Sequence, residues 1–407
     1  MALIVSITEG GSFLMRKHVA FVVVPEHGNV NPTLPLVREL IARGHKVSYA
    51  TGTKLLPALP DGVVAIATDS PVASLAPEFT EFDAGVFAEI MAGLLAQAEA
   101  ALPVLRQHFT ADPPDVICYD SMTFVGRVLS EQLGIPGVAL VPTFASNEHV
   151  DAEKMFTGDN FDHTNPKLGE VFGRMMAFAA EQGVAVGPLA SEVPPLSLVF
   201  VPQEFQVAGD TFDGDDRFVF VGADPAERPG YGTWEPPAGD APVLFVSLGT
   251  TWNARPDFFR DCVTAFADTD WHVVMAVGGR FDVSELGPLP ANFEVRPYVP
   301  QNTVLEHADM FISHAAMGSV LDALYYGVPL VCVPQMPENA ANARQVEDLG
   351  LGRLLGRDDR TPEMLRVTVE QLRVDEDVQA NVVKMRESVR ENWGPGLGAD
   401  AIEDYLN

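Results

Sequence analysis

Short apolar runs alternate with stretches of helical periodicity along the chain, and this alternation limits the possible folds more than any other feature. The run at 19–24 is apolar at every position, as expected of a strand covered on both faces. Apolar residues then recur at helical spacing over 34–43, and a second strand-like run follows at 46–50. Strands that alternate with helices predict parallel sheets built from βα units.

The same alternation occurs twice, with a different kind of sequence between the two series. Apolar runs at 115–119, 137–141 and 198–201 continue the first series, and runs at 243–250, 272–277, 293–296, 310–313 and 330–333 form the second. Residues 203–242 are crowded with Asp, Pro and Gly, which is typical of a linker. We expect an α/β protein with two Rossmann-like, doubly wound domains that face a cleft, where such sheets bind ligands.

These patterns give explicit boundaries. We predict a first domain over 15–202, a linker region over 203–242, a second domain over 243–390 and a C-terminal segment over 391–407. The length of 407 residues, at about 150 per domain, agrees with two or three domains. A strand-like run begins just after Met15, so we expect Met15 to be the functional start and residues 1–14 to be an extension.

Charge and composition exclude several classes of partner. The formal net charge is −30, which disfavours nucleic acid and anionic membrane surfaces as partners. Cys118, Cys262 and Cys332 lie far apart and have no zinc-site spacing, so they are expected to be unpaired thiols in a reducing compartment. No uninterrupted apolar run reaches about 18 residues, so we predict no membrane span and a cytoplasmic location.

The first candidate site is the turn between the first strand and the first helix, His27-Gly28-Asn29-Val30-Asn31-Pro32. Asn31 is the expected N-cap and Pro32 the first helical residue, so free backbone N–H groups would face the end of the sheet. The turn lacks a complete G-x-G-x-x-G motif and does not support dinucleotide binding. A plain tight turn is the alternative.

Two candidate sites lie in the second domain. At the first, Gly249 and Thr250 follow a strand, and hydroxyl and N–H groups there can hold a phosphate. At the second, a strand ends in His314 and a helix begins among small residues, a suitable cradle for a pyrophosphate that includes Ala316, Met317, Gly318 and Ser319. The alternative is that His314 only caps its strand.

Further polar and aromatic residues surround these turns. Tyr298, followed by Val299 and Gln301, offers a flat face for a base, and Asp322 can accept hydrogen bonds from ribose hydroxyls unless it is simply a solvated helix residue. Glu338 and Asn339 can bond sugar hydroxyls, although an ordinary polar loop explains them equally well. The histidines form no metal cluster, and Asp-x-Asp triplets at 213–215, 268–270 and 375–377 fit solvated loops, so no metal site is predicted. No G-x-S-x-G motif indicates a hydrolase.

Taken together, these sites resemble the family 1 nucleotide-sugar-dependent glycosyltransferases of GT-B fold, specifically the bacterial macrolide glycosyltransferase group. The resemblance runs from about Lys17 to the end of the chain. Its most specific stretches are 28–50, 218–222, 246–250, 299–301 and 311–335.

The resemblance implies a role for each site. Tyr298 would face the nucleobase and Gln301 the ribose, with Asp322 in the place of the ribose-binding acid. The diphosphate would be held by a group of residues and backbone N–H groups on two turns: Thr250, His314, Gly318 and Ser319. Glu338 and Asn339 would contact the donor sugar. The first domain would bind the acceptor, and a C-terminal helix would cross back onto it.

Several positions depart from the family pattern. Asn29 occupies the place of the histidine that deprotonates the acceptor, and asparagine cannot take a proton near neutral pH. Asp120 resembles the acid that orients that histidine. In the donor site, Tyr298 replaces tryptophan, Ala316 glycine, Asp322 glutamate and Asn339 glutamine. These changes leave UDP and dTDP donors both open.

Three interpretations follow from Asn29. The acceptor needs little deprotonation, as with an amide, an amine or an acidic phenol; or His27 or Asp120 takes over as catalytic base; or the chain is an auxiliary protein that binds the nucleotide sugar without catalysing transfer. A nucleotide-sugar epimerase of the same fold is a further alternative.

We expect an inverting hexosyltransferase that acts on a UDP- or dTDP-sugar and a small hydrophobic natural product, such as a macrolide, polyketide or macrolactam. No cofactor or metal is expected, and the sequence leaves a homodimer open.

Overall fold

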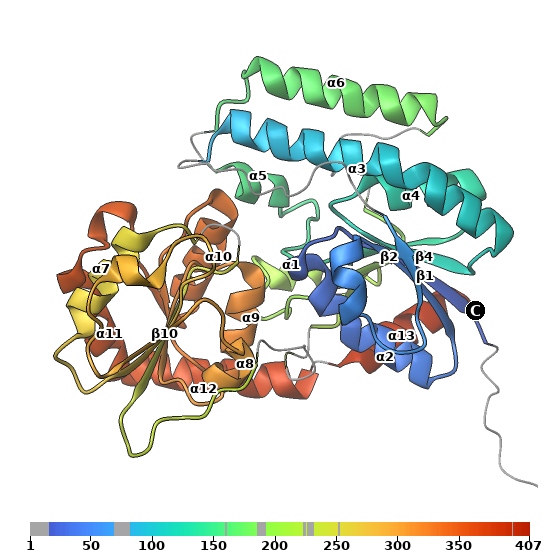
Figure 1. Ribbon diagram of the computed structural model, residues 1–407. Helices are drawn as coiled ribbons and strands as arrows, with labels where there is room; N and C mark the ends of the chain where they lie inside the picture. The colour runs from blue at the N-terminus through green and yellow to red at the C-terminus, as the bar shows by residue number, and fades with distance from the viewer. Residues whose placement is uncertain are drawn as a thin grey trace, which may run out of the picture.

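The computed structural model describes residues 16–68, 82–158, 161–184, 193–222, 225, 232–250, 253–392 and 394–407. The expected start at Met15 and the extension over 1–14 lie outside these residues. Two parallel sheets, each flanked by helices, form two domains side by side (Figure 1). This is the predicted fold class.

The first sheet has seven parallel strands in the order β3-β2-β1-β4-β5-β6-β7. Its strands are β1 His18–Val22, β2 Lys46–Thr51, β3 Val64–Ala67, β4 Val116–Asp120, β5 Gly137–Val141, β6 Ser197–Val199 and β7 Phe218–Phe220. The helices of this half are α1 His27–Val30, α2 Leu34–Ala42, α3 Ala84–Ala111, α4 Phe124–Leu133, α5 Ala152–Thr157 and α6 Pro166–Glu181, with 3-10 turns η1 Asn31–Thr33, η2 Thr53–Ala58 and η3 Gly209–Phe212.

Alternate residues of each central strand enter two separate cores. In β1, Ala20 and Val22 pack toward α3 and α4, whereas Val19 and Phe21 pack toward α2. This explains the uninterrupted apolar run, because both faces of the strand are covered.

The second sheet has six parallel strands in the order β10-β9-β8-β11-β12-β13. They are β8 Val243–Ser247, β9 His272–Ala276, β10 Phe293–Arg296, β11 Met310–Ser313, β12 Leu330–Cys332 and β13 Gly352–Leu354. The helices are α7 Pro256–Phe266, α8 Gln301–Leu305, α9 Met317–Tyr326, α10 Pro337–Asp348, α11 Pro362–Arg373, α12 Glu376–Asn392 and α13 Pro395–Tyr405, with 3-10 turns η5 Val283–Leu286 and η6 Arg357–Asp359.

Three strands were not predicted, and all three are edge or near-edge strands. β3, β7 and β13 are only three or four residues long, and β3 exposes most of its residues. The structure places β7 inside the region predicted as linker, where it pairs with β6 and completes the first sheet. Its three apolar residues are surrounded by the aspartates and glycines that dominate the composition there.

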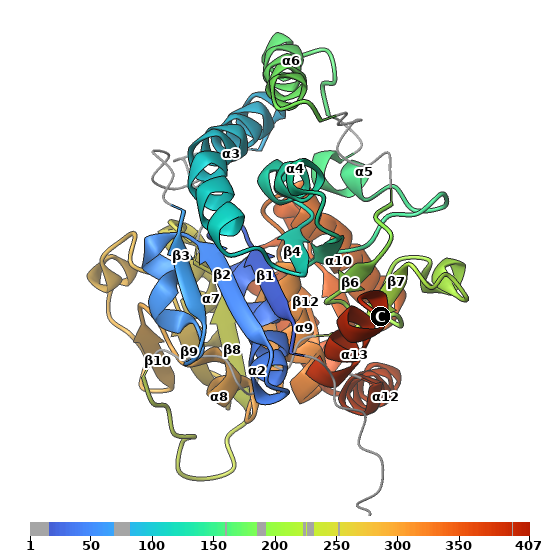
Figure 2. The ribbon, with the colours of Figure 1, turned by 90° about the vertical axis from the view of Figure 1, so that its right-hand side faces the viewer.

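The last helix, α13, packs on α2 of the first domain (Figure 2). Glu403 accepts hydrogen bonds from Nη1 of Arg43 at 3.1 Å and from Nε2 of His45 at 2.8 Å, and its side chain is 9% exposed. The C-terminus of the chain is therefore tied to the first domain by a largely buried ionic network.

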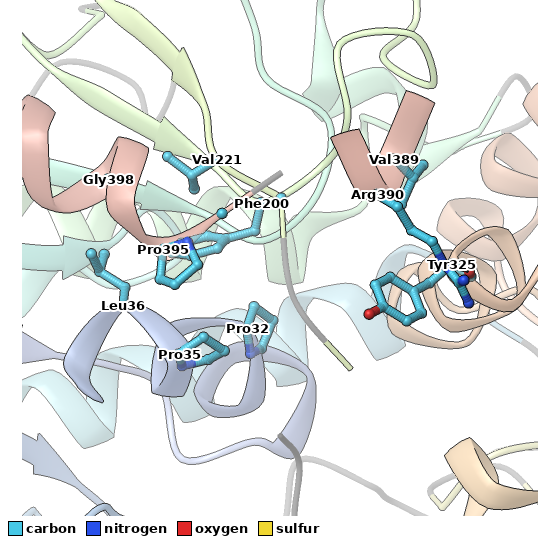
Figure 3. Close-up of a pocket in the computed structure, with 12 residues that line it drawn as sticks. Pro32, Pro35, Leu36, Phe200, Val221, Tyr325, Val389, Arg390, Pro395 and Gly398 are labelled. Atoms are coloured by element: carbon cyan, nitrogen blue, oxygen red, sulfur yellow. Dashed lines mark hydrogen bonds between the residues drawn. The ribbon is translucent and has the colours of Figure 1, made fainter. Parts of the chain in front are cut away.

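A small cavity of about 90 Å³ lies where the chain crosses back between the domains. Figure 3 shows Pro32, Pro395 and Phe200 on one side of it, and Tyr325 beside Arg390 on the other. The guanidinium of Arg390 lies 4.8 Å from the centre of the Tyr325 ring. Nearby, the N–H of Gly394 donates to the carbonyl of Val221. This hydrogen bond joins the end of the first sheet, just after β7, to the residue just before α13.

The two domains also meet at α5 and α10, which are in contact (Figure 1). Gly158, just after α5, lies against the ring of Pro337 at the start of α10. A segment of the first domain therefore covers the start of the helix that carries Glu338 and Asn339.

By length and composition α3 could cross a membrane, which the search for uninterrupted apolar runs did not predict. Of its most apolar 18-residue window, 56% is buried inside the protein. Leu95, Leu102 and Leu105 of this helix belong to the first core, as in a core helix of a folded domain.

Candidate functional site

The chain after β1 forms a helical turn, not the predicted glycine loop. Residues His27–Val30 form α1, whose N-cap is Glu26, and Asn31 belongs to the following 3-10 turn. The prediction of Asn31 as N-cap was therefore wrong, because the helical conformation begins four residues earlier. This turn carries Asn29 on its second half, at the carboxyl edge of the first sheet.

Asn29 and Asp120 are brought together from adjacent strands. Nδ2 of Asn29 donates to Oδ2 of Asp120 at 2.8 Å, and the backbone N–H of Met122 donates to Oδ1 at 2.8 Å. Asp120 is 1% exposed, and this burial raises its pKa to about 6 against the hydrogen bonds that lower it. The expected acid, Asp120, is therefore present, and it accepts a hydrogen bond from the side-chain amide of Asn29.

His27 does not take the place of the missing histidine beside Asp120. Its side chain hydrogen-bonds the side chain of Asn31, and partial burial lowers its pKa. The neutral ring is a possible proton acceptor by charge state, but the structure pairs it with Asn31 and leaves Asp120 with Asn29.

The first domain also holds an apolar pocket of about 230 Å³. Tyr119, Ser121 and Met122, which flank Asp120 in the chain, line it together with aromatic and aliphatic residues of α3, α4, α6 and β5. Its lining includes several of the Phe and Met residues of the first domain: Phe87, Met91, Phe124, Phe144, Phe172 and Met175. The pocket suits a hydrophobic molecule.

In the second domain, the turn after β8 packs directly against the end of β11. Gly249 has φ +75°, and a Cβ at this position would lie 2.6 Å from Cε1 and Nε2 of His314. Only glycine allows this approach. Burial lowers the pKa of His314 to about 4, against a hydrogen bond to the Ser247 backbone that raises it, so the ring is neutral and supplies no positive charge.

The N-terminus of α9 is a suitable place for an anion. Its N-cap, Ala316, makes no side-chain capping hydrogen bond, so the first N–H groups of the helix, at Met317 and Gly318, are not capped by that side chain. The side chain of Met317 is buried, which leaves its backbone as the functional group, and Ser319 is half-buried on the same turn. Thr250 lies exposed after Gly249 on the neighbouring turn.

Ala315 is held in an unusual conformation before this helix. Its φ is +62°, which is costly for a residue with a Cβ. Oγ of Ser313 accepts from its N–H at 3.1 Å, and Nδ2 of Asn342 donates to its carbonyl at 2.9 Å. These bonds fix the direction in which α9 starts.

Gln301 and Asp322 form a pair beside the exposed ring of Tyr298. Nε2 of Gln301 donates to Oδ2 of Asp322 at 2.7 Å, and Asp322 is 3% exposed. It is therefore not a solvated helix residue. Val299 is buried, whereas Tyr298 is 44% exposed and its hydroxyl faces Gly279.

Glu338 and Asn339 lie in the first turn of α10. Asn339 is buried, and burial raises the pKa of Glu338 to about 7 although the neighbouring Asn342 side chain lowers it. A carboxyl group at the N-terminus of a helix can bond hydroxyl groups.

Four buried polar atoms around this site could not be predicted from the sequence. Oδ1 of Asn253, Nδ1 of His314, Nε2 of Gln335 and Oδ1 of Asn342 are buried and have no hydrogen-bond partner among the residues that the structure describes. Buried polar groups are normally paired, so such atoms indicate a place where a ligand or water binds. Among the described residues, no group of three or more His, Cys, Asp or Glu side chains is placed to hold a metal ion.

Known proteins resemble the chain over nearly its whole length. A family profile described as the C-terminal domain of erythromycin biosynthesis protein CIII-like proteins matches residues 260–396. The demethyllactenocin mycarosyltransferase of Streptomyces fradiae is 36% identical, over 96% of this chain and 87% of that protein. The NDP-glycosyltransferase YjiC of Bacillus subtilis (strain 168) is 35% identical, over 97% and 98%.

Solved structures agree with these relatives. The calicheamicin glycosyltransferase CalG4 is 36% identical with a TM-score of 0.81, covering 96% of this chain and 98% of that one. The glycotransferase of kitacinnamycin is 34% identical with a TM-score of 0.85, covering 96% and 100%.

Proposed function

We propose the following reaction from the premise that this chain belongs to the NDP-sugar-dependent glycosyltransferases of GT-B fold and is itself a glycosyltransferase. It transfers a hexose from a UDP- or dTDP-sugar to a small hydrophobic natural product. The acceptor is a macrolide, polyketide or macrolactam-like compound that occupies the apolar pocket of the first domain. Related proteins named for the transfer of mycarose and for oleandomycin support this class of acceptor.

The observation that carries the acceptor chemistry is the hydrogen bond between Asn29 and Asp120. A histidine in this place would take a proton from a hydroxyl, and an amide cannot. The acceptor therefore reacts at a nitrogen or an acidic oxygen, where little deprotonation is needed.

The donor is held by the second domain. Its diphosphate binds the N–H groups of the first turn of α9 and the Gly249 turn, beside the neutral ring of His314. Tyr298 covers the base, and Glu338 and Asn339 bond the sugar. Transfer proceeds with inversion by direct attack of the acceptor, and no metal or cofactor takes part.

Replacing Asn29 with His tests this function. We expect turnover of hydroxyl acceptors to rise by about 10²–10⁴-fold, because a general base is restored beside Asp120. The rates of native and N29H protein are compared on alcohol, phenol, amine and amide acceptors with UDP- and dTDP-glucose. No gain with alcohols would show that another residue already acts as base.

The absence of that histidine also supports a second function, a protein that binds nucleotide sugar without transferring it. If the native protein binds UDP or dTDP but turns over none of these acceptors, the transferase proposal fails and the binding function replaces it. Appearance of an epimerised donor without acceptor would instead identify an epimerase. Cytoplasmic location and a homodimer remain predictions.

A further inference from the structure

We infer that Asp120 is a positioning residue that turns the carboxamide oxygen of Asn29 toward the acceptor, so that the site selects a neutral nucleophile carrying a hydrogen over an ionised phenolate. The inference rests on the proposed transferase function. The absence of the histidine is compatible with amines or amides and with acidic phenols as acceptors. The orientation of the Asn29 amide distinguishes between these two kinds of acceptor.

The orientation of the amide follows from the chemistry of its partner. An ionised carboxylate only accepts hydrogen bonds, so the end of Asn29 that lies 2.8 Å from Oδ2 of Asp120 is the NH₂ group. Oδ1 of Asp120 is already bonded by the N–H of Met122, which holds the carboxylate in place. If the carboxamide rotated by half a turn, its oxygen would face Oδ2 of Asp120, and two hydrogen-bond acceptors would lie against each other.

The other end of the amide is available to a ligand. Asn29 is half-buried, whereas Asp120 beneath it is fully buried, so the carboxamide oxygen is at the more open end. Among the described residues, none donates a hydrogen bond to this oxygen. Tyr119, Ser121 and Met122, the neighbours of Asp120 in the chain, line the pocket assigned to the acceptor, so an acceptor in it lies beside the segment that carries Asp120.

This oxygen accepts hydrogen bonds and carries no charge that can be neutralised. An N–H or neutral O–H of the acceptor donates to it and is held with its lone pair free to attack. A phenolate oxygen would instead face a lone pair of the Asn29 oxygen. The negative carboxylate of Asp120 lies behind it, and no described cation is bonded to that carboxylate, so the phenolate would be repelled.

The transfer step balances without a base. The nitrogen lone pair of an amine forms the bond to C1 of the sugar while the C1–O bond breaks and its electron pair leaves on the diphosphate. The nitrogen is then a cationic ammonium, and it loses the proton held at Asn29 to water, because an amide oxygen is too weak a base to keep it.

Matched aromatic acceptors test the selection. An aniline and a phenol of the same shape, the phenol carrying electron-withdrawing groups so that it is ionised at pH 8, are compared with UDP-glucose and dTDP-glucose. We expect native protein to prefer the aniline by about tenfold in kcat/KM, roughly the value of one strong hydrogen bond. A preference for the phenolate would overturn the inference.

Asp120→Asn is the decisive variant. The neutral amide at position 120 lets the Asn29 carboxamide rotate and present its NH₂ group to the acceptor. The KM for the phenolate should therefore fall, and the ratio of kcat/KM for aniline to that for phenolate should approach one. Equal loss with both acceptors would mean that Asp120 is only structural. If this variant does not fold, Asn29→Leu removes the oxygen, and the KM of the aniline alone should rise; an unchanged preference would refute the inference.

Binding distinguishes this inference from the proposed function. Affinities of both acceptors are measured by calorimetry in the presence of UDP, which requires no turnover. Tighter binding of the aniline without any transfer would contradict the transferase function and support the selection. Tighter binding of the phenolate would contradict the selection whatever the turnover.

Discussion

The two halves of the molecule place their sites at the same topological position and build them differently. In each sheet, strand order reverses next to the first strand of the domain, between β1 and β4 and between β8 and β11. Ligands of such sheets bind at this switch point. Asn29 and Asp120 meet at the first, and Gly249 and His314 meet at the second.

At the first switch point the polar groups pair with each other, and at the second they do not. Both oxygens of Asp120 are bonded within the protein. Around the second, one buried polar atom each of Asn253, His314, Gln335 and Asn342 has no hydrogen-bond partner in the described part of the chain. The comparison indicates that the second switch point is organised around a polar ligand, whereas the Asp120 carboxylate at the first is already bonded within the protein. We therefore expect substitutions at the second switch point to change nucleotide affinity, and substitutions in the first domain away from Asn29 and Asp120 to change stability.

The largest effect is expected from Gly249→Ala. The added Cβ would overlap the His314 ring and displace the two turns that we propose to hold the diphosphate, so the Kd for UDP or dTDP should rise about 100-fold by calorimetry. Gly214→Ala is the matched control, because Gly214 has a similar φ of +77° and no atom within 4 Å of its Cβ position. If both variants lost nucleotide affinity equally, backbone strain alone would explain the loss, without overlap between the Cβ and His314.

Glu403→Ala should affect stability and leave nucleotide affinity unchanged. It leaves Arg43 and the buried His45 without their shared partner, so the free energy of unfolding should fall by about 3 kcal/mol in urea titrations. Asp400→Ala removes a more exposed partner of Arg43 and should cost less than about 1 kcal/mol. A change in the Kd for UDP would contradict the separation of the two halves.

The pH dependence of stability should have opposite signs at the two sites. Folding raises the pKa of Asp120 from 3.8 to about 6, so the native state binds more protons in this range and the contribution of Asp120 falls as pH rises through it. Folding lowers the pKa of His314 from 6.5 to about 4, so its contribution rises with pH between these values. Thermal melting of Asp120→Asn and His314→Asn from pH 4 to 7, compared with native protein, should give difference curves of opposite slope.

The smallest effect is expected at Tyr298. Removing its exposed ring in Tyr298→Ala should weaken UDP or dTDP binding about fivefold, the value of an aromatic contact. Tyr298→Phe keeps the ring and should bind nearly as well as native protein. A similar loss in both variants would assign the contact to the hydroxyl and not to the face of the ring.

Much of the fold was predictable because its signal is local. The central strands are buried on both faces and appear as unbroken apolar runs, so β1, β2, β5 and β8–β12 were located to within a few residues. The short edge strands β3, β7 and β13 have no such run, and neighbouring residues dominate their pattern. The turn after β1 was placed correctly, but its helical conformation was not predicted, because the glycine at 28 suggested an open loop.

The candidate site divides in the same way. Residues that follow strands, such as Asn29, Asp120 and His314, could be selected because parallel strands end at one edge of a sheet. Asn253 and Asn342 could not, since each is an ordinary polar residue inside or before a helix. Their importance appears only where Asn253 donates to the Gly249 carbonyl and Asn342 to the Ala315 carbonyl.

By itself the sequence determined two doubly wound domains and which side chains stand at the ends of their strands, because periodicity and turn chemistry act over a few residues. Only the tertiary structure decided which of those side chains pair. The partners Asn29 and Asp120 are 91 residues apart, and Arg43 and Glu403 are 360 apart. No local pattern encodes such contacts, since they depend on strand order and on the docking of whole elements. That is why the sequence shows that the histidine is missing, and the structure shows that an acid holds the amide in its place.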